Sequence, residues 1–168
     1  FPQKGAPKDL FQKVHRPVPA IAILSSQHFP DELQGNLLIC NVIGFQGISQ
    51  YKFVDAGSGF HAEQVETIVS SSDPNFRPND LEIGGDGALY FLDWQNPLIG
   101  HMQHNLRDPS RDHLHGRVYR LTVDGRPPLE IAKMMGKPVI EVLEHLESKT
   151  KSVRYRARLE LSGRDSHE

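Results

Sequence analysis

Short apolar runs separated by turn residues dominate the first three quarters of the chain. They are rich in Val, Ile, Leu, Tyr and Phe and are bounded by Gly, Pro, Asp and Ser, which is typical of β-strands. No helical pattern interrupts them before residue 129, so we expect antiparallel pairing. The predicted strands cover residues 20–24, 36–41, 48–54, 63–69, 80–83, 88–93 and 117–123.

Part of this pattern is repeated along the chain. Residues 35–41 (GNLLICN) align without gaps on residues 87–93 (GALYFLD), and residues 47–55 align on residues 116–124. The LLIC and LYFL segments are apolar on both faces, as expected for strands that are covered on both sides. A repeated unit of several strands indicates propeller blades. The expected fold class is therefore mainly β, with the antiparallel blades of a partial β-propeller.

The pattern becomes helical after residue 129. Apolar residues between 139 and 146 fall at helical spacing and follow Pro138, which suits a first helical turn. A second segment, about residues 152–161, carries apolar residues four apart and has Ser152 available as a cap. We therefore expect two parts: a partial propeller of about two blades over residues 1–128, and a helical part over residues 129–168.

Composition excludes several classes of protein. The formal net charge is −2 and basic and acidic residues are interspersed, so the sequence shows no basic patch of the kind that binds nucleic acid. No segment approaches the ~18 apolar residues of a membrane span. The single cysteine, Cys40, lies in an apolar run and is expected to be buried. The chain begins Phe-Pro-Gln, and together with the partial repeat this suggests a piece of a longer protein.

A long insertion separates the two halves of the second repeat. The first copy has five residues at this point (42–46), whereas the second has 22 (94–115), which include four of the nine histidines of the chain. Long loops inside compact domains are usually functional or disordered, and this one is anchored by apolar residues. Because the loop that enters the same unit, residues 70–79, opens at the same end of the sheet, we expect the two loops to meet there.

Four residues of these loops are the candidate site. His101 and His104 can titrate near neutral pH and are candidate bases, whereas Arg77 and Arg107 could bind an anionic cofactor or substrate. Arg77 could instead form a structural pair with Asp73 or Asp80. The histidine spacing matches no known metal motif, so surface or hydrogen-bonded histidines are the favoured interpretation and no metal is predicted.

Residues 75–94 and 115–121 resemble the quinoprotein glucose/sorbosone dehydrogenase-like β-propellers. Residues 99–121 are similar to a subgroup of that family, large membrane-bound dehydrogenase-like proteins of environmental bacteria, in which a propeller precedes HEAT-like repeats and a c-type cytochrome domain. Residues 153–161 resemble the opening of those HEAT-like repeats. Arg77 matches an arginine that this family uses. The family's lysine has no counterpart in residues 42–46, and no Cys-x-x-Cys-His occurs.

The resemblance implies a periplasmic or extracytoplasmic protein that oxidises a sugar or alcohol and passes electrons to a quinone or cytochrome partner. Pyrroloquinoline quinone is the cofactor that it implies, and haem would belong to a cytochrome domain elsewhere in the parent chain. Two alternatives remain open at this point. The chain could be a non-catalytic scaffold that binds carbohydrate or a protein partner through the same face, or a purely structural unit.

Overall fold

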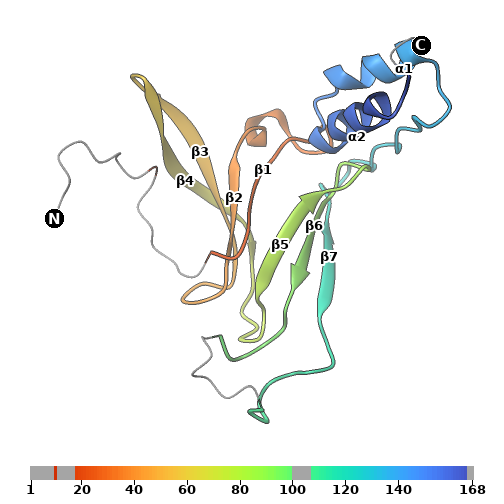
Figure 1. The fold of residues 1–168 in the computed structure, drawn as a ribbon. Coiled ribbons are helices and arrows are strands. Elements are labelled where there is room, and N and C mark those ends of the chain that lie inside the picture. Colours follow the sequence, from red (N-terminus) through yellow and green to blue (C-terminus); the bar gives the residue numbers. More distant parts are fainter. Residues whose placement is uncertain (1–9, 11–17, 100–106, 166–168) are drawn as a thin grey trace.

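A computed structural model describes residue 10 and residues 18–99 and 107–165. They form two antiparallel sheets that lie side by side, with a helix pair at one end and the described parts of the insertion at the other (Figure 1). The first sheet has the order β1-β2-β3-β4, and its strands are β1 (Ile21–Ile23), β2 (Leu37–Asn41), β3 (Gly47–Ala56) and β4 (Gly59–Ser70). The second has the order β5-β6-β7, and its strands are β5 (Pro78–Ile83), β6 (Leu89–Asp93) and β7 (Arg117–Leu121).

The expected propeller and HEAT-like fold is wrong, although the strands lie close to their predicted positions. Among the described residues, the sheets have four and three strands and close into neither a propeller nor a barrel. Two short α-helices follow them there: α1 (Val139–Glu144) and α2 (Lys151–Ser162). Two single-turn 3₁₀ helices, Asp31–Leu33 and His145–Glu147, complete the elements. The repeat reflects how each strand pairs with its neighbour in sequence, since consecutive strands of a sheet are usually adjacent. It carries no information on whether sheets close into a ring.

The main core lies between the two sheets. Ten buried residues form it: Leu24, Phe29, Leu38, Cys40, Ile48, Phe76, Leu81, Ile83, Leu89 and Phe91. The Cys40 thiol is fully buried and free, as expected, and burial followed by the nearby charge of Asp80 raises its pKa to about 12. This cysteine is therefore a packing residue and not a nucleophile, because only the thiolate reacts.

The two equivalent strands differ in how they are covered. Every residue of β2 is buried, as the LLIC pattern predicts, because a second cluster that includes Leu37 and Ile39 packs on its other face. In β6, by contrast, Leu92 is 43% exposed, so the expectation of two covered faces is wrong for this strand. Apolar residues on both faces therefore do not guarantee that a second layer is present.

A buried histidine connects the two sheets. His28 follows β1 and is 1% exposed. Its Nε2 accepts a hydrogen bond from the Val123 N–H at 2.9 Å, and its Nδ1 lies 3.2 Å from the Pro127 carbonyl oxygen. Only the neutral ring with its proton on Nδ1 satisfies both contacts. His28 therefore joins the first sheet to the segment that follows β7.

The turn between β5 and β6 is an Asp-Gly turn at Asp86–Gly87, a dipeptide that favours hairpin turns. Gly87 has φ +79°, and a Cβ placed there would lie 2.8 Å from Ser26 Oγ, so the position requires glycine. Asp86 accepts hydrogen bonds from the Ala88 N–H, from Tyr90 Oη and from Arg120 Nη2. This network fixes the end of the second sheet on which the helices rest.

Hydrogen bonds hold α2 against both sheets. The Lys151 N–H donates to the Ser25 carbonyl at 3.0 Å, and the Ser152 hydroxyl donates to the Gly84 carbonyl at 2.9 Å. Ser152 therefore does not cap the helix, whose N-cap is Thr150. Four buried residues pack the helix pair together: Met134, Val142, Val153 and Ala157.

Candidate functional site

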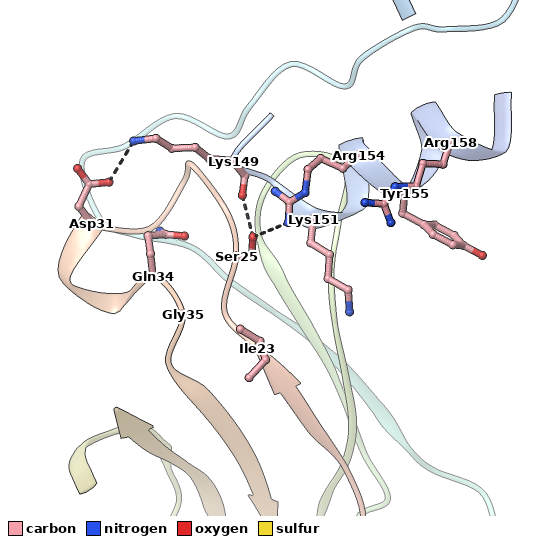
Figure 2. Close-up of a pocket in the computed structure, with 10 residues that line it drawn as sticks. All are labelled: Ile23, Ser25, Asp31, Gln34, Gly35, Lys149, Lys151, Arg154, Tyr155 and Arg158. Carbon is pink, nitrogen blue, oxygen red and sulfur yellow. Dashed lines mark hydrogen bonds and ion pairs between the residues drawn. The ribbon is translucent and has the colours of Figure 1, made fainter. Parts of the chain in front are cut away.

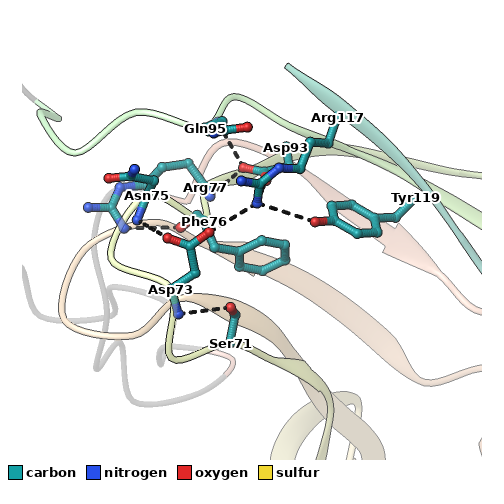
Figure 3. A network of polar contacts seen from close by, with 9 residues as sticks. All are labelled: Ser71, Asp73, Asn75, Phe76, Arg77, Asp93, Gln95, Arg117 and Tyr119. Atoms are coloured by element: carbon teal, nitrogen blue, oxygen red, sulfur yellow. Dashed lines mark hydrogen bonds and ion pairs between the residues drawn. The ribbon is translucent and has the colours of Figure 1, made fainter. Parts of the chain in front are cut away.

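Asp93 is the central residue at the end of the second sheet where the 70–79 loop and the insertion meet. It ends β6, its side chain is fully buried, and its Oδ1 accepts hydrogen bonds from the backbone N–H groups of Arg77 (2.7 Å) and Gln95 (2.8 Å). Its other oxygen forms an ion pair with Arg117 at 3.2 Å (Figure 3). The Asp93 carboxylate thus connects the 70–79 loop, the first residues of the insertion and β7. Gln95 itself has a positive φ of 47°, which marks the sharp turn into the insertion.

Arg117 extends this connection to Asp73. Its Nη1 lies 3.0 Å from Asp73 Oδ2 and 3.3 Å from Tyr119 Oη. A hydrogen bond from the Asn75 N–H, followed by the bond from Arg117, holds the pKa of Asp73 below its ordinary value. The bond to Asp73, followed by that to Tyr119, raises the pKa of Arg117. Both groups therefore stay charged at neutral pH, and they lock the 70–79 loop to the start of β7.

Arg77 packs beneath the insertion instead of facing outward. It is 6% exposed, and its guanidinium donates to the carbonyl oxygens of Phe76 (3.0 Å) and Pro97 (3.3 Å). Neither predicted partner, Asp73 or Asp80, forms an ion pair with it among the described residues. Burial lowers the pKa of Arg77, against the nearby charges of Asp93 and Asp73. The expected meeting of the two loops is confirmed for the described residues, and the Arg77 side chain joins them by donating to a backbone carbonyl of the insertion instead of to a side chain.

The insertion is described on both sides of residues 100–106. His101 and His104 lie within that range, outside the described residues, so their assignment as bases stays a prediction. Arg107 is exposed, and its assignment as a cofactor ligand stays a prediction. The two described parts of the insertion meet where Arg111 Nη1 donates to the Leu98 carbonyl at 3.3 Å.

A surface hollow of about 580 Å³ lies where these two parts meet. We call it the Trp94 hollow, and its lining residues are Trp94, Asn96, Arg111, Asp112, His113, Leu114 and His115. Trp94 is 44% exposed, so it is a surface residue and not the buried loop anchor that its place after a strand suggests. Asn96 is buried, and its side-chain oxygen accepts a hydrogen bond from the Leu98 N–H, which holds residues 96–98 in a turn.

A histidine and a carboxylate pair within the Trp94 hollow. His115 Nδ1 lies 2.9 Å from Asp112 Oδ2, and Asp112 Oδ1 also accepts the backbone N–H groups of Leu114 and His115. The hydrogen bond from the Leu114 N–H is the main reason that the pKa of Asp112 lies below its ordinary value. The charged Asp112 carboxylate therefore orients the His115 imidazole through Nδ1. The other ring nitrogen, Nε2, can then contact a ligand or accept a proton.

The Trp94 hollow lies in the insertion that the sequence analysis singled out, but none of its lining residues is among the four candidates named there. Trp94 is the only tryptophan of the chain, and it directly follows a strand that ends in a buried aspartate. This position, directly after a predicted strand and at the start of the insertion, is the sequence feature that could have pointed to Trp94 as a site residue. The pairing of Asp112 with His115 depends on a local turn in which the aspartate side chain accepts N–H groups two and three residues later.

The contacts of Arg77 do not fit the role of a quinone-cofactor ligand. Both terminal nitrogens of Arg77 already donate to backbone carbonyls, so they are not presented to a cofactor carboxylate. In the described parts of the chain, no group of three His, Cys, Asp or Glu side chains is arranged to hold a metal ion.

A family profile matches residues 18–125, more than half of the chain. The chain belongs to the DUF7133 family, a domain of unknown function. In this DUF7133 chain the matched region contains both sheets and the Trp94 hollow, whereas α1 and α2 follow it. No curated protein and no solved structure matches the chain. Within the described residues, no helix has the length and apolar character needed to cross a membrane.

Proposed function

We propose that this DUF7133 chain binds a sugar or sugar alcohol in the Trp94 hollow. The observation that carries the proposal is a half-exposed tryptophan beside the ordered Asp112–His115 pair. An indole face takes the C–H groups of a sugar ring, while charged and hydrogen-bonding side chains take its hydroxyls. The hollow is also of the size of small-molecule sites, which are roughly 300–1,000 Å³.

The rigidity of the surrounding loops supports this proposal. The Trp94 N–H donates to the Arg77 carbonyl at 3.0 Å, and Gln95 is held by the buried Asp93. These bonds fix the tryptophan backbone before any ligand arrives, so little conformational entropy is lost on binding. Arg77 contributes by supporting the loop and not by touching the ligand.

Binding can be measured directly through Trp94, because it is the only tryptophan of the chain. Titration with glucose and with sorbitol should give a saturable change in its emission, with calorimetry as an independent readout. His115→Ala should weaken binding by about tenfold while the fluorophore is kept. His61→Ala, in the β3–β4 hairpin, is the matched control and should leave binding unchanged. Absence of saturable binding by both methods would refute the proposal.

A second candidate function, oxidation of the bound sugar or alcohol, is favoured by the carboxylate-oriented His115. Oxidation of a carbinol to a carbonyl releases two protons and two electrons. His115 would accept the hydroxyl proton as a general base. The carbinol C–H hydrogen would leave with both electrons as a hydride to a quinone, which becomes a hydroquinone on taking up the proton held by His115. A cytochrome partner would then reoxidise the hydroquinone; the resemblance implies a quinone or cytochrome partner of this kind. A periplasmic location belongs to the same proposal.

One assay separates the two candidate functions. The chain is incubated with glucose or sorbitol and an added soluble quinone, and reduction of the quinone is followed by absorbance. Sugar-dependent reduction that is lost in His115→Ala would support the enzyme. Saturable binding without reduction would favour the non-catalytic binding role.

A further inference from the structure

A basic groove lies at the opposite end of the molecule, between α2 and the first sheet (Figure 2). It has a volume of about 780 Å³. We call it the α2 groove, and its lining residues are Ile23, Ser25, Asp31, Gln34, Gly35, Lys149, Lys151, Arg154, Tyr155 and Arg158. Four of these side chains are cationic and one is anionic, although acidic residues outnumber basic ones in the whole chain.

The positive charge of the α2 groove is largely unneutralised. Lys151 and Arg158 form no ion pair among the described residues. Lys149 lies 3.8 Å from Asp31, but both side chains are strongly exposed, so this contact stabilises the fold little. Clustered like charges raise the energy of a surface, and an anionic ligand would relieve that repulsion.

The cationic side chains form one stripe along α2. Lys151, Arg154 and Arg158 are spaced i, i+3 and i+7, so the stripe is about 10 Å long at about 1.5 Å per residue. Tyr155, 58% exposed, lies on the same face. In an extended peptide, alternate side chains are roughly 7 Å apart, so two or three acidic residues on one face would follow this stripe.

The opposite wall of the groove offers the edge of a sheet. β1 is the first strand of its sheet and pairs only with β2 among the described residues, and its last residue, Ile23, lines the groove. Exposed strand edges pair with extended peptides through main-chain hydrogen bonds. A peptide can therefore use both walls, with its backbone on β1 and its carboxylates on α2.

The groove is also preorganised. Ser25 accepts the Lys151 N–H with its carbonyl, and its hydroxyl donates to the Lys149 carbonyl at 2.8 Å. Arg154 Nη2 in turn donates to the Ser25 hydroxyl at 3.3 Å. These bonds fix the distance between β1 and the cationic stripe of α2.

We propose that the α2 groove docks an extended acidic peptide segment of a partner protein, which adds to β1 as a further strand. This docking surface is independent of the sugar site, because it lies at the helix end of the sheets and Trp94 lies at the loop end.

Fluorescence anisotropy of a labelled peptide tests this docking. A peptide of about eight residues that alternates Glu with Val should bind the chain, and its Gln-for-Glu analogue should bind about tenfold more weakly or worse. The same acidic peptide with N-methyl groups on alternate backbone nitrogens should also lose binding, because it cannot donate to the edge of β1. Equal binding of the N-methylated peptide would overturn strand addition.

Variants locate the binding on the protein. Lys151→Glu combined with Arg158→Glu should weaken binding by about tenfold or more, since both reversals place like charges against the ligand. Lys133→Glu combined with Arg156→Glu is the control with the same change of charge: both side chains are exposed, neither lines the groove, and the variant should change binding by less than about twofold. Equal losses in both variants would overturn the proposal in favour of diffuse charge attraction. Thermal melting confirms that both variants are folded.

Competition distinguishes other anions. A heparin fragment or inorganic triphosphate that binds the groove while the acidic peptide does not would refute a peptide partner. Peptide binding that leaves the emission of Trp94 and its response to sugar unchanged is the expected result. Because the two sites have separate readouts, failure of peptide docking does not affect the test of the sugar site.

Discussion

Replacing Asp93 by alanine should break the junction that holds the Trp94 hollow in place. The buried carboxylate accepts two backbone N–H groups, those of Arg77 and Gln95, and forms an ion pair with Arg117. A typical hydrogen bond contributes about 1 kcal/mol, and a buried donor left unsatisfied costs about 1–3 kcal/mol. Breaking a buried ion pair costs about 3–5 kcal/mol, and less when the remaining partner can reach water.

These contributions overlap, and the guanidinium of Arg117 is 34% exposed, so it can be rehydrated when Asp93 is removed. We therefore expect Asp93→Ala to lower the free energy of unfolding by about 3 kcal/mol, near the lower end of that range. Whole domains are stable by only about 5–15 kcal/mol, so this loss is large.

Urea denaturation followed by circular dichroism measures this loss by linear extrapolation. Asp73→Ala is the control, because Asp73 pairs with the same Arg117 but is 35% exposed. It should lower the free energy of unfolding by much less. A loss below about 1 kcal/mol for Asp93→Ala, or equal losses for both variants, would show that burial of this junction does not stabilise the fold.

Three further predictions follow from single contacts. His28→Ala removes the link between the sheets and should cost about 2 kcal/mol in urea denaturation, whereas the same change at the partly exposed His61 should cost less than about 0.5 kcal/mol. Burial by itself raises the pKa of Asp86, but its hydrogen bonds outweigh burial and hold the pKa below its ordinary value. The contribution of Asp86 to stability should therefore be complete near neutral pH and be lost as the pH falls below about 4, and Asp86→Asn should reduce that pH-dependent loss. Gly87→Ala should lower the melting temperature more than Gly125→Ala, because both have positive φ but a Cβ meets neighbouring atoms only at Gly87; equal effects would contradict this.

The sequence by itself determined the elements of this protein. Each of the seven strands in the described part of the chain lies within a few residues of a predicted apolar run, and Gly87 has the positive φ that an Asp-Gly turn favours. The helices follow Pro138 and the change to helical spacing. Burial of Cys40 also followed from its apolar neighbours. These features depend on residues close together in the chain, where side-chain alternation and backbone preferences act directly.

Only the tertiary structure decided how these elements combine. The repeat predicted propeller blades, but the sheets stay open, because local similarity does not specify how one sheet packs on the next. Arg77 was recognised as important, yet its partners are backbone carbonyls that packing brings to it. The α2 groove joins Ile23 to Lys151, which are far apart in sequence. Such contacts are set by which surfaces bury together, and the free energy of that burial is a property of the whole fold and not of any one segment.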